Sequence, residues 1–217
     1  MDTVHNLVRK SQQGDASAFE SLVTMYQGRI YGLSYHLTGN HDDAQDLAQE
    51  AFIRAHSALG RFRGDADFGT WLHRITVNTW INLQRSRKKH NFVSLDEPYE
   101  MEDGQVQRET AAASDNPEAL YEEKEFRQLV RHALSELTEE HRAVLVLRDV
   151  HGYSYDEVAR ILDCTLGTVK SRINRARLVM KEKLTFLAKR SGYAIPFAID
   201  RQGGDNDGLP ASKNARP

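Results

Sequence analysis

Basic residues are concentrated in the stretch "GTVKSRINRARL", residues 167–178. If it is helical, one face carries residues at i, i+3, i+4 and i+7, namely Thr168, Ser171, Arg172 and Arg175. Arginine donates two parallel hydrogen bonds to guanine in the major groove, and short hydroxyls near a helix N-terminus also reach base edges. The pattern therefore favours sequence-specific recognition of double-stranded DNA.

Three further polar residues flank this face, and they are suited to holding phosphates: Lys170, Asn174 and Arg177. Phosphate contacts fix the register of a protein on DNA without reading its sequence. The alternative is a solvated basic face on a helix that packs elsewhere, and the stretch alone leaves that alternative open.

The segment "RFRGDADFGTWLHRITVNTWINLQRSRKKH", residues 61–90, interleaves aromatic and basic residues. Bases of single-stranded nucleic acid stack on aromatic rings for about 1–3 kcal/mol each, while cations follow the backbone. The alternative places the aromatic rings in the core and the cations at a helix C-terminus, where the helix dipole favours them. The candidates for nucleic-acid contact are Arg63, Phe68, Trp71, Arg74, Asn78 and Arg85, with Trp80 among the interleaved rings.

An acidic face is expected on the segment "DAQDLAQEAFIRAHSAL". Asp43, Asp46 and Glu50 fall on one side beside Gln49, away from the alanine and leucine stripe. Such a face is most often only solvated.

Helices must position all these side chains. Apolar steps of three and four predict a helix over 19–37 that stops at Gly39, and a second over 44–59 that stops at Gly60. Thr70 is predicted to cap a third helix that buries Leu72, Ile75, Thr76 and Leu83.

The second half of the chain is predicted to contain a helix-turn-helix motif. Helices are expected around 118–135 and 139–149. Ser154 and Glu157 then form a capping box, and after a tight turn Thr165 caps the next helix. The fold class is all-α, because no segment shows a strand pattern.

Charge divides the chain into parts. Residues 91–125 hold 11 acidic and two basic residues, whereas basic residues predominate in 1–90 and in 126–190. We expect two small helical domains, 1–90 and 118–190, joined by an acidic flexible linker, 91–117, and followed by a disordered tail, 191–217.

Several classes of protein are disfavoured. No apolar run is long enough to cross a membrane, and the single cysteine, Cys164, excludes an internal disulfide and a cysteine zinc site. The histidines are scattered, so we expect no metal and no cofactor. "DFG" at 67–69 and "LRD" at 147–149 lack the glycine-rich loop of a kinase, and we expect no enzyme. The location expected is the cytoplasm.

The order of the motifs resembles the sigma-70 family, specifically the extracytoplasmic-function (ECF) group of bacterial sigma factors. The likeness covers about residues 5–190 and rests on "DAQDLAQEAFIRAHSAL", "RFRGDADFGTWLHRITVN" and "LRDVHGYSYDEVARILDCTLGTVKSRINRAR". It implies a protein that binds core RNA polymerase, through the β′ clamp and the β flap, and directs initiation at promoters.

The resemblance also implies a role for each group of residues. The polymerase-binding positions are Asp43, Asp46, Leu47, Gln49 and Glu50. Arg63, Phe68, Trp71, Arg74, Asn78 and Arg85 match the minus-ten segment, which holds flipped single-stranded bases. The helix at 167–178 would read the minus-thirty-five element as double-stranded DNA. An anti-sigma factor is a further partner implied for this group, and a stand-alone helix-turn-helix regulator is the alternative.

Overall fold

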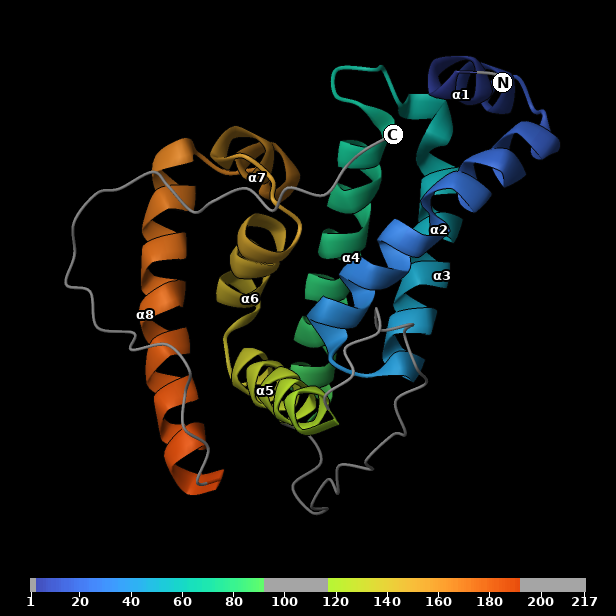
Figure 1. Ribbon diagram of the computed structural model, residues 1–217. Helices are drawn as coiled ribbons and strands as arrows, with labels where there is room; N and C mark the ends of the chain where they lie inside the picture. Colours follow the sequence, from blue (N-terminus) through green and yellow to red (C-terminus); the bar gives the residue numbers. More distant parts are fainter. Residues whose placement is uncertain (1–2, 92–116, 192–217) are drawn as a thin grey trace.

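The computed structural model describes residues 3–91 and 117–191, and in that part every regular element is a helix and no strand is present (Figure 1). This confirms the all-α prediction. The predicted flexible linker and disordered tail lie outside the described residues, except for Asn91, Pro117 and Ser191 at helix ends. The helices are α1 (Val4–Gln12), α2 (Ala16–Thr38), α3 (His41–Ala58), η1 (Leu59–Arg61), α4 (Phe68–Asn91), α5 (Pro117–Ser135), α6 (Glu139–Leu145), η2 (Val146–Val150), α7 (Tyr155–Leu162) and α8 (Leu166–Ser191).

Helices α1 to α4 form the first region, residues 3–91. The predicted stop at Gly39 is confirmed, because this residue adopts φ 88°, a left-handed conformation that glycine tolerates best. The Asn40 side chain then accepts a hydrogen bond from the Asp43 amide and so begins α3. The sequence patterns did not predict α1, a short amphipathic helix of nine residues that buries Leu7 and Val8.

The start of α4 differs from the prediction. The helix begins at Phe68, and the Asp67 carboxylate accepts a hydrogen bond from the Thr70 amide. Asp67 therefore supplies the cap that was predicted for Thr70, because a carboxylate reaches the free amides of the first turn. Leu83, predicted to be buried, is 38% exposed.

Helices α5 to α8 form the second region, residues 117–191. The predicted capping box is present: Ser154 Oγ accepts from the Glu157 amide at 3.3 Å, and Glu157 Oε2 accepts from the Ser154 amide at 2.8 Å. Asp163 ends α7 in the left-handed region at φ 52°. Thr165 Oγ1 accepts from the Thr168 amide, which confirms the predicted cap of α8.

Removing the capping box should destabilise this region measurably. We expect Ser154→Ala to lower the free energy of unfolding by about 1 kcal/mol, because the Glu157 amide in the first turn of α7 loses the hydroxyl that accepts its hydrogen bond. Urea unfolding followed by circular dichroism measures the loss. Ser57→Ala, at an exposed position of α3, is the control, and an equal loss there would contradict the capping role.

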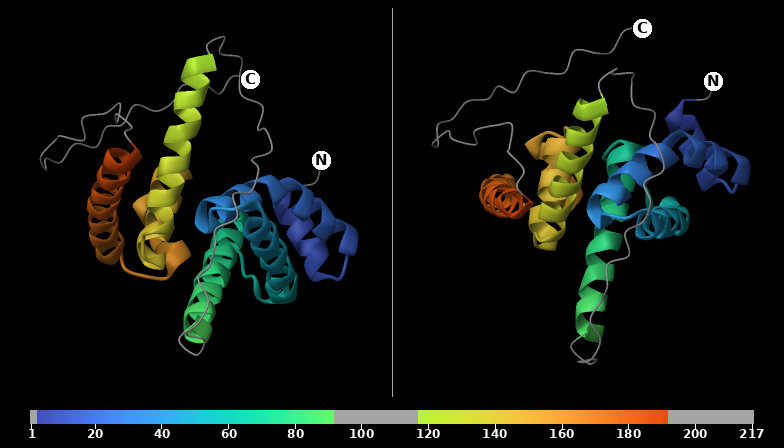
Figure 2. Two further views of the ribbon diagram at one scale, coloured as in Figure 1. Left: turned by 90° about the horizontal axis from the view of Figure 1, so that it is seen from below. Right: turned by 60° about the horizontal axis from the view of Figure 1, so that its bottom comes forward.

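The two regions also pack against each other, which the sequence did not indicate. Leu33, Leu37 and Trp80 of the first region join Val144 and Ile173 of the second in one buried cluster. In Figure 2, α4 and α2 lie next to α6 and α5, with α8 outermost on one side and α1 on the other. Helix α4 packs against α7 and α6, so it is the first region's main contact with the second.

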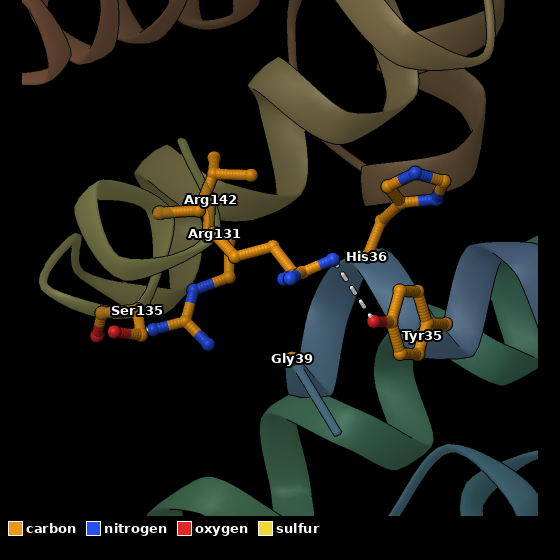
Figure 3. A pocket seen from close by; sticks show the side chains of 7 residues that line it. Tyr35, His36, Gly39, Arg131, Ser135 and Arg142 are labelled. Carbon is orange, nitrogen blue, oxygen red and sulfur yellow. Dashed lines mark hydrogen bonds between the residues drawn. The ribbon is translucent and has the colours of Figure 1, made fainter. Parts of the chain in front are cut away.

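Arg142 of α6 stabilises this contact between the two regions. Its Nη1 donates to the Leu37 carbonyl at 2.8 Å and its Nη2 to the Ser135 carbonyl at 2.5 Å, while its guanidinium lies 5.4 Å from the centre of the Trp80 ring. Figure 3 shows Arg142 and Arg131 beside a small cavity of about 20 Å³, which has room for about one water molecule. The Leu37 carbonyl belongs to the last turn of α2, where carbonyls lack helical partners and attract a cation.

Candidate nucleic-acid and polymerase interfaces

Helix α8 presents the predicted reading face to solvent. Val169, Ile173 and Ala176 are fully buried and fix the rotation of the helix. The opposite side carries the predicted base-reading residues, of which Ser171 and Arg175 are exposed and Thr168 and Arg172 half-buried. An exposed row of hydroxyls and guanidinium groups fits the major groove.

The flanking phosphate candidates divide into two kinds. Lys170 and Asn174 are exposed. Arg177, in contrast, forms a two-bond ion pair with Asp149, with Nη2 to Oδ1 at 2.7 Å and Nε to Oδ2 at 3.2 Å. The hydrogen bonds that Arg177 donates to the Asp149 carboxylate raise the pKa of Arg177. Arg177 would have to leave Asp149 before it could hold a phosphate.

The aromatic residues of α4 that were predicted to stack on bases are less exposed than such stacking requires. Trp80 is 1% exposed and Phe68 4%, because both rings pack in the core. Their predicted stacking on bases is therefore corrected to a structural role in this conformation: Phe68 contacts Tyr26 and Trp71 through edge and tilted ring contacts. Trp71 is half-buried, and Arg63 and Asn78 are exposed.

Two predicted minus-ten arginines are paired with the second region. Arg74 Nη2 lies 3.0 Å from Asp163 Oδ2, in the turn of the helix-turn-helix, and Arg85 Nη2 lies 3.7 Å from Glu140 Oε1. The structure thus brings the two predicted DNA-binding faces close together.

Helix α3 carries the predicted polymerase face. Asp46 and Gln49 are exposed, and Glu50 forms an ion pair with Arg54 at 2.6 Å. Leu47 is 1% exposed and belongs to the buried cluster shared with Trp80. Its predicted contact with a partner is corrected, because its side chain faces the core and no surface is left to present.

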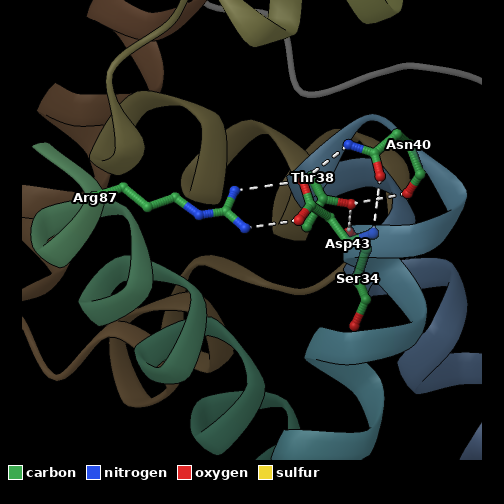
Figure 4. Close-up of polar contacts among 5 residues, drawn as sticks. All are labelled: Ser34, Thr38, Asn40, Asp43 and Arg87. Atoms are coloured by element: carbon green, nitrogen blue, oxygen red, sulfur yellow. Dashed lines mark hydrogen bonds and ion pairs between the residues drawn. The ribbon is translucent and has the colours of Figure 1, made fainter. Parts of the chain in front are cut away.

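Asp43 already has partners within the chain (Figure 4). Its carboxylate lies 2.7 Å from Arg87 Nη2 on α4 and 2.9 Å from the Asn40 side-chain amide. The hydrogen bond from Arg87 holds the pKa of Asp43 below its usual value. Asp43 therefore ties α3 to α4 in this conformation, and Asp46, Gln49 and Glu50 form the accessible part of the acidic face.

A histidine cluster that the sequence did not reveal lies where the two regions pack against each other. His36 of α2 and His73 of α4 flank His151, with ring centres 5.6 Å and 6.2 Å from it, and Tyr153 Oη lies 3.1 Å from His73 Nδ1. Burial, then the nearby His36 and His73, lowers the pKa of His151 to about 4. These residues are far apart in the chain, and only tertiary packing shows that they belong together.

The cluster predicts a pH dependence. Because the folded pKa of His151 lies below its usual 6.5, its contribution to stability is complete above pH 6.5 and is lost as the pH falls toward 4. Between pH 7.5 and pH 5.0 we expect the contribution of His151 to the free energy of unfolding to drop by about 1 kcal/mol, after allowing for partial solvent screening. Urea unfolding at both values measures this.

His151→Phe should remove most of that drop, because a neutral ring keeps the ring contacts and cannot gain a proton. His5→Phe, at an exposed position of α1, is the matched control and should behave as the unmodified chain. Equal drops in all three proteins would contradict the assignment to His151.

Two observations concern other classes of site. Among residues 3–91 and 117–191, no group of three or more metal-binding side chains is arranged to hold a metal ion. In the same part of the chain, no helix has the length and apolarity needed to cross a membrane.

Comparisons with known proteins show which family the two regions match. Residues 22–90 match the family model "Sigma-70 region 2", and residues 127–180 match "Sigma-70, region 4". The chain is 40% identical over 187 residues to the ECF RNA polymerase sigma-E factor of Escherichia coli K12 and 39% identical over 187 residues to the RNA polymerase sigma-H factor of Pseudomonas aeruginosa. Each alignment covers 85% of this chain and 95% of the relative.

Solved structures share the fold. The sigma factor RpoE of Bartonella quintana, solved with the anti-sigma factor NepR, aligns with a TM-score of 0.60 at 24% identity, covering 77% of this chain and 96% of that one. CnrH, solved with the cytosolic domain of CnrY, aligns with a TM-score of 0.59 at 24% identity, and the alignment covers 85% of this chain and 99% of CnrH.

The helical core, the helix-turn-helix and the two matched regions define a promoter-recognition protein that works with RNA polymerase. The chain belongs to the sigma-70 family, in its ECF group. It binds core RNA polymerase and directs transcription initiation at promoters through regions 2 and 4.

Proposed function

We propose that the residues 1–90 and 118–190 divide promoter recognition between them. Helix α8 reads the minus-thirty-five element through Thr168, Ser171, Arg172 and Arg175, with Lys170, Asn174 and, once freed, Arg177 on phosphates. The observation that carries this assignment is the row of exposed and half-buried polar side chains on the side of α8 away from the buried Val169, Ile173 and Ala176.

The minus-ten element is assigned to the first region. Arg63, Trp71, Arg74, Asn78 and Arg85 contact the flipped single strand, and Phe68 supports Trp71 from within the core. Flipping a base costs a few kcal/mol, which stacking on Trp71 and a shaped pocket offset. The half-buried Trp71 and the exposed Asn78 support this assignment.

The partners follow from these faces. Asp46, Gln49 and Glu50 on α3 contact the β′ clamp, and the second region contacts the β flap. An anti-sigma factor is a further partner, because the solved relatives RpoE and CnrH are in complex with NepR and with the cytosolic domain of CnrY. The protein acts in the cytoplasm, where core polymerase is found, and it catalyses no reaction of its own.

Run-off transcription tests the division of labour. Purified chain, added to core polymerase on a library of promoters, should select templates that share two separated elements. Templates that retain only one element should support little transcript. A helix-turn-helix regulator without sigma activity would leave the start sites of core polymerase unchanged.

Charge reversal on α3 should block assembly. We expect Glu50→Lys to weaken binding to core polymerase at least tenfold, because a surface complementary to this acidic face would then meet a positive charge. Fluorescence anisotropy of labelled protein titrated with core polymerase measures the affinity. Glu20→Lys, at an exposed position of α2, is the control, and equal weakening by both variants would contradict the assignment of this face.

A further inference from the structure

Acidic residues of the second region occupy the basic side of α4. Besides the Arg74–Asp163 and Arg85–Glu140 pairs, Lys88 Nζ lies 2.5 Å from Glu139 Oε1. At 3.6 residues per turn, positions 74, 85 and 88 fall within about 60° of one another around the helix. One face of α4 therefore meets three carboxylates of the second region.

This face is the one that the proposed function gives to the minus-ten strand. A nucleic acid would supply anionic phosphates at the same places, because cations beside a single strand follow its backbone. Glu139 and Glu140 open α6, and Asp163 ends α7. Burial acts to raise the pKa of Glu139, but the hydrogen bonds from Lys88 and from the backbone, together with the charges of Lys88 and Arg142, outweigh burial and keep this pKa below its usual value.

The contact also conflicts with binding both promoter elements at once. Asp163 stands in the turn directly before α8, so its bond to Arg74 joins the two reading helices. Elements named minus ten and minus thirty-five are about 25 base pairs apart, or about 85 Å at 3.4 Å per base pair. The two regions must separate before they can occupy both.

We propose that Glu139, Glu140 and Asp163 act as an internal phosphate mimic, which closes the free chain over its own minus-ten face. The inference rests on the proposed function of that face. Arg142 against Leu37 and Trp80, and Tyr153 against His73, complete the closed contact. All three cations and the Asp163 and Glu140 carboxylates are solvent-accessible, whereas the Glu139 side chain is 17% exposed. An accessible ion pair changes an equilibrium only about 1.4- to 5-fold, so closure is reversible.

The test removes the mimic without adding bulk. The triple variant Glu139→Gln/Glu140→Gln/Asp163→Asn keeps the size of each side chain, and asparagine tolerates the left-handed backbone at position 163. The control Glu20→Gln/Glu125→Gln/Glu182→Gln removes the same charge from exposed positions elsewhere. Circular dichroism and thermal unfolding verify that both full-length variants fold.

Two readouts are then compared at the same salt concentration. Small-angle X-ray scattering gives the radius of gyration, which we expect to increase only in the triple variant. Anisotropy with fluorescein-labelled dT20 gives the affinity for single-stranded DNA, which we expect to rise about tenfold in the triple variant and clearly less in the control.

Each result decides the question. The proposal is overturned if the radius is unchanged and the affinity rises no more than in the control. It is also overturned if dT20 binds with unchanged affinity although the radius is larger. Higher affinity than the control together with a larger radius supports the proposal. Higher affinity at an unchanged radius overturns closure, because the carboxylates then only repel DNA. If no protein binds dT20, the proposed minus-ten face is wrong, and the radius alone decides whether these carboxylates hold the regions together.

Discussion

Replacing Trp80 by alanine should cause the largest loss of stability of any single substitution considered. We expect a loss of about 3–5 kcal/mol in the free energy of unfolding, because a large buried ring is exchanged for a cavity. Trp80 is 1% exposed and packs between Leu37, Leu47 and the second region, with Arg142 over its ring. Urea unfolding followed at 222 nm measures the change.

Phe186→Ala is the matched control for this loss. Phe186 is 56% exposed on α8, so its truncation removes little buried area and should cost less than about 1 kcal/mol. A loss below about 1 kcal/mol for Trp80→Ala would mean that the seam between the two regions is loosely packed or absent in solution.

The second large effect concerns promoter choice. We expect Arg172→Ala and Arg175→Ala each to lower affinity for the preferred minus-thirty-five sequence about 5- to 150-fold, the range of 1–3 kcal/mol for a bidentate contact with guanine. The loss should be confined to one or two base-pair positions and should disappear on DNA altered at those positions. Competition binding of polymerase holoenzyme to single-base variants of the element measures this.

Lys170→Ala separates base reading from phosphate binding. Lys170 is exposed beside the reading face, and its loss should weaken binding evenly across sequences and lower the slope of log affinity against log salt by about 0.9. A uniform loss in Arg172→Ala and Arg175→Ala, equal to that of Lys170→Ala, would contradict the assignment of base reading to these arginines.

Local signals in the sequence were sufficient for much of the second region. The capping box at Ser154, the cap at Thr165 and the apolar seam of α8 depend on residues within a few positions of one another, and the structure confirms all three. The buried seam also determines which side of α8 faces solvent, so the exposed reading face could be predicted without tertiary information.

Predictions for the first region were less successful where burial decided the outcome. Trp80, Phe68 and Leu47 have residue types that suit either a core or a binding surface, and the structure places all three in the core. Periodicity could not separate the alternatives, because α4 is covered on one side by its own region and on another by α6 and α7.

The sequence by itself determined the helical class, the two regions, the family and the helix-turn-helix, because each depends on short-range patterns of apolar, capping and basic residues. Only the tertiary structure decided that Arg74, Arg85 and Lys88 meet Asp163, Glu140 and Glu139, and that His36, His73 and His151 share one cluster. These partners lie far apart in the chain, and their pairing depends on how two separately patterned regions pack, which no local signal encodes.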